Sequence, residues 1–138
     1  MRDEQYIINL CDAVLRRRAN RQHRFDFLRG DKCNKSNEKI VHIFPEQGRK
    51  LPVDAYYEEL NLVVEFLEIQ HFKSVRHFDK PNFLTVSGVN RGEQRKIYDA
   101  RRRIKLSEKG ICLIEIPYTA FNHREKAENL FVMKILTD

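Results

Sequence analysis

A chain of 138 residues is long enough to form one domain with a buried core. Hydrophobic residues make up 41% of it and charged residues 33%, which excludes a disordered chain, and no apolar stretch approaches the roughly 18 residues of a membrane span. The net charge of +6 favours a polyanionic partner. We therefore expect one soluble domain over residues 1–138, with no membrane partner.

The cysteines indicate a reducing environment. Cys11, Cys33 and Cys112 are odd in number and form no C-x-x-C pair, so disulfides and a zinc site are not expected. Residues 1–5 lack the features of a signal peptide. Both observations predict a cytoplasmic protein.

The first predicted element is an amphipathic helix of about four turns, because apolar residues recur at helical spacing from Ile7 to Leu15. The arginines at 16–18 follow it, where cations suit the helix dipole. The next segments are a brief strand or turn, a polar loop and a strand, at residues 24–31, 33–39 and 40–44.

The strongest strand patterns lie at residues 51–57 and 62–72. Only residues 58–61 separate them, and so short a gap predicts an antiparallel hairpin. Residues 73–89 then show no clear period, which indicates a long connection with one strand at 83–86.

A helix is predicted from Asn90, which can cap its start, to Lys109, with Gly110 placed to end it. Its narrow apolar stripe consists of Ile97, Ala100 and Ile104. The basic residues on the opposite side are Arg95, Arg102, Lys105 and Lys109.

Residues 111–116 form an apolar run that Pro117 stops, as in a buried strand, and residues 127–135 suggest a closing helix. The resulting order is α, β, β, β, α, β, α. The basic helix connects the strand before it to the strand after it and so forms a crossover. We therefore expect an α/β fold with a mixed sheet and helices on both faces.

Two acids stand inside the apolar sequence of the hairpin. Asp54 lies within residues 51–57 and Glu65 within residues 62–67, and a turn through Glu59 and Leu60 would make the two acids face each other. Facing carboxylates repel, and a divalent cation such as Mg²⁺ between them would remove the conflict. The alternative is an edge hairpin whose acids point to water or to arginines.

These residues carry a resemblance. Pro52-Val53-Asp54 on one strand, with an acid-rich strand next, resembles the PD-(D/E)xK nuclease superfamily. An Asp, an acid eleven residues later at Glu65, and then Gln70-His71 resemble the branch related to very-short-patch-repair endonucleases. Tyr98-Asp99, the arginines after them and residues 110–118 resemble the helix and final strand of that branch. The resemblance covers residues 51–118 and implies a restriction-endonuclease-like αβββαβ core.

The chain also departs from the family pattern. Leu67-Glu68 stands where many relatives have Asp-Gly, and the family's lysine is missing, because the candidate triplets end in Leu67 and Gln70. The second metal ligand is therefore open between Glu65 and Glu68. Strict alternation puts these two acids on opposite faces of the strand, and a bulge near Leu67 would bring both to one site.

The resemblance implies a metal-dependent endonuclease that hydrolyses DNA phosphodiester bonds. Asp54 with Glu65 or Glu68 would hold Mg²⁺ or Mn²⁺, which activates water. His71 would act as general acid or base because its ordinary pKa lies near neutrality, and Gln70 would position water or a ligand carboxylate.

The arginines are the expected DNA contacts, and those singled out are Arg24, Arg95, Arg102 and Arg103. For the helix, the alternative is a solvated charged face, and Asp99 is expected to pair with Arg102 or Arg103. Two rival functions stay open: a catalytically silent nucleic-acid-binding domain, and a basic interaction subunit. A homodimer is possible.

Overall fold

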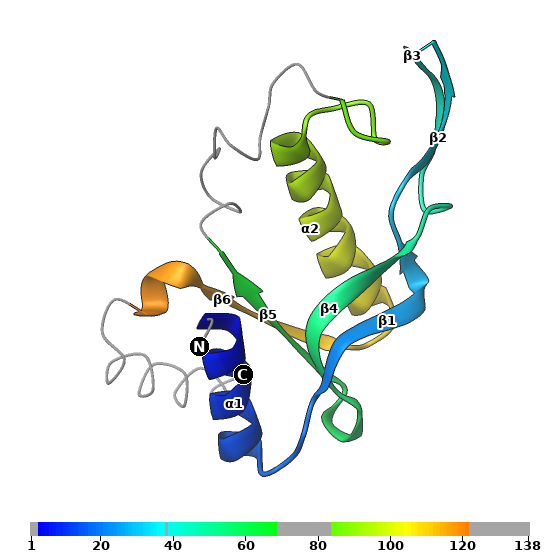
Figure 1. Ribbon diagram of the computed structural model, residues 1–138. Coiled ribbons are helices and arrows are strands. Elements are labelled where there is room, and N and C mark those ends of the chain that lie inside the picture. Colours follow the sequence, from blue (N-terminus) through cyan, green and yellow to red (C-terminus); the bar gives the residue numbers. More distant parts are fainter. Residues whose placement is uncertain (1–2, 38, 69–83, 122–138) are drawn as a thin grey trace. The chain divides into compact units, whose positions relative to one another are not determined.

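The computed structural model describes residues 3–37, 39–68 and 84–121 (Figure 1). Contacts within the chain divide it into two compact units. Unit 1 comprises residues 1–23, 53–69 and 110–138, and unit 2 comprises residues 24–52 and 70–109. The expectation of a single domain stays a prediction.

The main elements, in chain order, are α1 (Asp3–Leu15), β1 (Asn20–Arg29), β2 (Lys32–Ser36), β3 (Lys39–Phe44), β4 (Lys50–Tyr57), β5 (Leu62–Leu67), α2 (Arg91–Glu108) and β6 (Cys112–Pro117). Short 3-10 turns follow β4 at Glu58–Leu60 and β6 at Tyr118–Phe121. A four-stranded sheet has the order β1-β4-β5-β6, and β2 and β3 form a separate two-stranded sheet. Because β4 and β5 are antiparallel while β5 and β6 are parallel, the predicted mixed sheet is confirmed.

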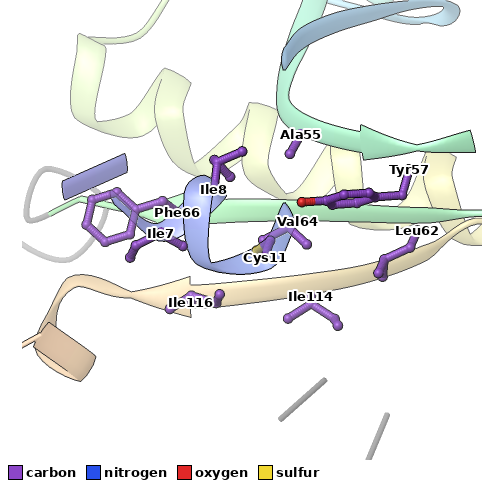
Figure 2. Close-up of a cluster of buried hydrophobic side chains, with 10 residues drawn as sticks. All are labelled: Ile7, Ile8, Cys11, Ala55, Tyr57, Leu62, Val64, Phe66, Ile114 and Ile116. Carbon is purple, nitrogen blue, oxygen red and sulfur yellow. The ribbon is translucent and has the colours of Figure 1, made fainter. Parts of the chain in front are cut away.

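Unit 1 has an apolar core between α1 and one face of its strands. The predicted helix is confirmed: Ile7, Ile8 and Cys11 are fully buried on one side of α1. Figure 2 shows them against alternate residues of three strands: Ala55, Tyr57, Leu62, Val64, Phe66, Ile114 and Ile116. Since side chains alternate across a strand, the residues between these lie on the opposite face of the sheet.

Asp12, near the end of α1, connects this helix to the core through its side chain. Its Oδ1 atom accepts hydrogen bonds from the Tyr57 hydroxyl at 2.7 Å and the Ala19 amide at 3.1 Å. Its Oδ2 atom forms an ion pair with Arg21 at 3.1 Å. The partly buried carboxylate is thus satisfied by three donors, which offsets the cost of its partial desolvation.

Unit 2 contains the hairpin of β2 and β3, and here a prediction was wrong. Residues 33–39 were expected to be a loop, but β2 pairs with β3 from Lys32↔Phe44 to Ser36↔Lys39. Most side chains of both strands are exposed, so no apolar alternation marks β2 in the sequence. The strand expected at 40–44 is confirmed, and residues 24–29 belong to the longer β1.

The strand expected at residues 83–86 is absent from residues 84–86, where a turn begins at Val86. The Thr85 amide donates to the Val89 carbonyl at 2.9 Å, and the Gly88 amide donates to the Thr85 carbonyl at 3.0 Å. Gly88 has a φ of +77°, which favours glycine. Residues 73–83 of the predicted connection and the predicted closing helix at 127–135 lie outside the described residues.

Both predicted ends of α2 are confirmed. The Asn90 side chain accepts a hydrogen bond from the Glu93 amide at 3.0 Å, and Gly110 follows the helix with a φ of +70°. However, the apolar stripe is not on the side of α2 that faces the strands of unit 2. Ile97 and Ile104 are 37% and 58% exposed, so the stripe lies at the surface.

Polar contacts explain this orientation of α2. Arg102 donates from Nε to the Pro52 carbonyl at 3.3 Å, and Lys105 pairs with Glu46 at 3.1 Å. The fully buried Leu106 of α2 adds an apolar contact to these polar ones. Arg102 and Lys105, which were expected on the side opposite the stripe, therefore make contacts within unit 2.

Candidate functional site

The acids of unit 1 lie on the sheet face opposite the α1 core. Ala55 and Tyr57 of β4 are in the core, which puts Asp54 on the other face. In β5, Val64 and Phe66 are in the core, and Glu65 between them is on the other face. Asp54 and Glu65 therefore share one face of two adjacent strands.

The register brings the two acids to neighbouring positions. The β4–β5 ladder pairs Tyr57↔Leu62 and Ala55↔Val64, as the predicted turn requires. The ladder ends at Ala55↔Val64, and one further step in the same register would set Asp54 opposite Glu65. The Phe66 amide donates to Asp54 Oδ2 at 2.7 Å, so the Asp54 carboxylate is held against β5. Glu65 is only 9% exposed, which makes its charge costly to bury without a favourable partner.

A third acid continues this row, and the sequence alone did not single it out. Glu65 pairs in register with Glu115 of β6, and Ile114 and Ile116 on either side of Glu115 are in the core. The available signal was the one that marked Asp54 and Glu65, namely an acid inside an apolar run. Like charges opposite each other on adjacent strands are destabilising unless other groups compensate them.

Glu68 occupies a different position from Glu65. It is exposed and is the first residue after β5. The β5–β6 ladder is regular from Leu62↔Cys112 to Leu67↔Pro117, so the bulge considered near Leu67 does not occur in this ladder. Leu67 stands on the same face as Glu65, where the family's lysine would be. Gln70 and His71 lie outside the described residues.

Asp54 and Glu65 could supply two carboxylate ligands to a cation, but they do not form a complete coordination shell. Among residues 3–37, 39–68 and 84–121, no group of three or more His, Cys, Asp or Glu side chains is placed to hold a metal ion. Mg²⁺ usually binds one or two protein carboxylates and keeps several waters, so two carboxylates are a sufficient protein contribution.

The predicted DNA-contacting arginines lie in unit 2 and differ in their surroundings. Arg102 is mostly buried and pairs with Asp99 at 3.2 Å, which confirms the expected ion pair within the helix. Arg103 and Arg24 are exposed, and Arg24 donates to the Lys50 carbonyl. Arg95 is half-buried.

A second group of arginines belongs to unit 1. The arginines at 16–18 follow α1 and line a cavity of about 430 Å³ together with Tyr56 and Glu58. Arg17 pairs with Glu59 at 3.1 Å. The acids of this cavity offset part of its positive charge, so it is a weaker anion site than its arginines alone suggest.

Burial raises the pKa of two groups in the core of unit 1. Desolvation raises the pKa of the Cys11 thiol to about 12, so the thiol is neutral at physiological pH. Burial, followed by the hydrogen bond to Asp12, also raises the pKa of Tyr57. In unit 2, the hydrogen bond to Glu46 raises the pKa of Lys105.

Comparison with known proteins identifies similarity to a viral protein. No family model matches the chain, and no solved structure matches it. The chain is similar to uncharacterized protein 094L of Frog virus 3 (isolate Goorha), with 34% identity over 87 residues. The match covers 59% of this chain and 51% of the viral protein, so the chain spans about half of that relative's length. In the described residues, no helix is long and apolar enough to cross a membrane.

Proposed function

We propose that the chain is a Mg²⁺-dependent endonuclease with a restriction-endonuclease-like core that hydrolyses DNA phosphodiester bonds. The topology supports this proposal. When the β2–β3 hairpin is set aside, the order α1, β1, β4, β5, α2, β6 is the αβββαβ order that the family resemblance implies. The antiparallel β4–β5 pair and the parallel β5–β6 pair give the expected mixed sheet.

The observation that carries the proposal is the position of Asp54 and Glu65 on one face of adjacent strands. They are the two acids of the motif, and the Phe66 amide holds the first of them at 2.7 Å. Carboxylate oxygens fit Mg²⁺, which we propose they hold. When bound, the cation would lower the pKa of a water and polarise a phosphoryl oxygen.

The other residues of the chain have supporting roles in this proposal. The hydrogen bond from the Phe66 amide fixes one oxygen of the Asp54 carboxylate. The low exposure of Glu65 excludes most water from its carboxylate, which strengthens electrostatic interactions there. His71 is proposed as the proton donor or acceptor, and Gln70 as the residue that positions water.

One observation favours a second candidate, a DNA-binding domain without catalysis. Leu67 takes the position of the family's lysine, and its apolar side chain cannot stabilise the negative charge that develops on the phosphate. In this alternative, the fold and the basic residues are retained for binding alone.

A cleavage assay separates the two candidates. Supercoiled and linear DNA are incubated with the protein and MgCl₂ or MnCl₂, with EDTA and an Asp54→Asn variant as controls. We expect cleavage with either metal, none with EDTA, and none by the variant, which should still bind DNA in a gel-shift assay. DNA that is bound but stays intact with both metals would establish the silent domain.

A further inference from the structure

Unit 2 has a cavity of its own at the base of the β2–β3 hairpin. Its volume is about 730 Å³, within the range of small-molecule sites. Residues from the end of β1, the start of β2, the segment before β4 and Tyr98 of α2 line it. The cations among them are Arg24, Arg29, Lys32, Arg49 and Lys50.

The positive charge of this cavity is only partly compensated. Asp31, the acid in its lining, pairs with Arg101 at 2.8 Å and so is already neutralised. Lys50 pairs with Asp26. Arg29 instead donates to the carbonyls of Asp26 and Gly48, which orient the guanidinium without cancelling its charge. The cavity therefore favours an anion.

The wall of the cavity is held by backbone contacts. The Gly30 amide donates to the Arg49 carbonyl at 2.9 Å, and the Gly48 amide donates to the Gly30 carbonyl at 2.7 Å. A Cβ atom on Gly48 would lie 2.4 Å from the Asp31 carbonyl oxygen, so only glycine permits this approach. The Asp31 amide donates to the Tyr98 hydroxyl at 2.9 Å. Such preorganisation reduces the entropic cost of binding a ligand.

Part of the remaining lining is apolar, and this part indicates the second component of the ligand. Leu51, Pro52, Val86 and Tyr98 line the cavity beside the cations. A ligand with a phosphate and a flat, largely apolar face matches both parts, because nucleobases bind against aromatic and apolar side chains. We propose that this cavity binds one nucleotide.

The hairpin favours a nucleotide that belongs to a strand over a free one. Lys35 and Lys39 lie exposed on β2 and β3 and extend the positive charge beyond the cavity. A phosphodiester backbone can follow such a row of cations. The identity of this strand as DNA rests on the proposed function, whereas the nucleotide site does not.

Chemical modification of Cys33 can report ligand binding in this cavity, and Cys112 serves as a control. Cys33 lines the cavity and is half-buried, whereas Cys112 is exposed on β6 in unit 1 and Cys11 is fully buried. The rate of N-ethylmaleimide modification of Cys33 and Cys112 is measured by mass spectrometry in EDTA, so that no metal or cleavage is involved. The ligands are dAMP, deoxyadenosine, inorganic phosphate and a short single-stranded oligonucleotide.

We expect nucleotides to slow the modification of Cys33 and to leave Cys112 unchanged. At a ligand concentration ten times Kd, the rate at Cys33 should fall about tenfold, in proportion to the unoccupied fraction. Deoxyadenosine and phosphate alone should protect much less than dAMP. Protection by the oligonucleotide at lower nucleotide concentrations than dAMP supports a strand, and equal protection supports a free nucleotide.

A matched pair of variants tests the cations. Arg49→Glu should raise the dAMP concentration that gives half-maximal protection of Cys33 about tenfold or more, since Arg49 is exposed and lines the cavity. Arg91→Glu makes the same charge change at the exposed start of α2, outside the cavity, and should have little effect. Unchanged Cys33 rates with dAMP and the oligonucleotide would overturn the proposal, and so would protection by phosphate equal to that by dAMP. The Asp54→Asn variant should retain the protection, which separates this site from the proposed nuclease site.

Discussion

The two units of the chain are stabilised in different ways. In unit 1, α1 buries Ile7, Ile8 and Cys11 against alternate apolar residues of three strands. In unit 2, α2 makes mainly polar contacts: Arg101 with Asp31, Lys105 with Glu46, and Tyr98 with the Asp31 amide. Charged and polar residues thus contribute more contacts on α2 than on α1, although Leu106 of α2 is also fully buried.

This difference corresponds to two tasks in the proposed function. An apolar core fixes strand register, because a slip by one residue would move every apolar side chain to the other face. Register is what Asp54 and Glu65 require in order to share a face. Polar contacts, by contrast, keep arginines and lysines near the surface, where they can bind an anion. The following predictions test this division, from the largest expected effect to the smallest.

The largest effect is expected at the acids of unit 1. Glu65→Gln should lower the rate of DNA cleavage about a thousandfold, because it removes a proposed metal ligand that supplies several kcal/mol in the transition state. Glu68→Gln should stay within a few-fold of the wild-type rate, since Glu68 is exposed beyond the end of β5. Single-turnover cleavage measures both, and a larger loss for Glu68→Gln would reverse the assignment.

The second effect is on the free energy of unfolding. Ile8→Ala should destabilise the protein by about 2–5 kcal/mol, because the side chain is 1% exposed in the core of unit 1. Ile104→Ala should change stability by about 0.5 kcal/mol or less, because Ile104 is 58% exposed on α2. Urea unfolding followed by circular dichroism gives both values. Equal losses would mean that the stripe of α2 is buried in solution.

The third effect appears at alkaline pH and belongs to the core of unit 1. Because burial raises the pKa of Cys11 from 9.0 to about 12, its contribution is complete below pH 9 and is lost as pH rises toward 12. Over this window the free energy of unfolding should fall by about 1.4 kcal/mol per pH unit from this thiol alone. Tyr57, whose pKa is also raised, adds to the fall at higher pH.

Cysteine variants isolate this contribution. Urea midpoints are measured between pH 8 and pH 11 for Cys11→Ala and Cys112→Ala. The first variant should show a shallower loss of stability with pH, and the second, which removes an exposed thiol, should follow the wild type. Identical slopes for all three proteins would show that the Cys11 thiol ionises in the folded state.

The smallest effect concerns two neighbouring arginines of α2. Arg103 is exposed, and Arg103→Ala should lower the slope of log Kd against log salt by about 0.9, one phosphate's share of released counterions. Arg102→Ala should leave this slope unchanged and lower stability instead, because its guanidinium is bonded to Asp99 and Pro52. A reduced slope for Arg102→Ala would show that this side of α2 contacts DNA.

The elements that were predicted correctly are marked in the sequence by an apolar pattern or by a capping residue. The structure confirms the helix around Ile7, the strand at 51–57 and the caps of α2. It confirms the strand expected at 62–72 only over Leu62–Leu67, and residues 69–72 lie outside the described residues. The register of the β4–β5 hairpin also followed from its short turn.

The features that were missed have different physical causes. β2 has no buried face, so its sequence lacks the alternation of a strand. The apolar stripe of α2, formed by Ile97, Ala100 and Ile104, did not indicate which side of the helix packs against the strands. That side forms ion pairs with residues far away in sequence, which periodicity does not predict. Glu115 was not singled out as a site residue because its position beside Glu65 depends on the parallel pairing of β5 and β6.

The most direct test of the proposed site is the location of a bound metal ion. Crystals soaked in MnCl₂ would be measured by anomalous scattering, which identifies Mn²⁺ independently of any activity. We predict a peak within coordination distance of the Asp54 and Glu65 carboxylates, which Asp54→Asn removes. A peak at Glu68 without Asp54, or no peak at this face of the sheet at a saturating concentration of Mn²⁺, would contradict the proposed site.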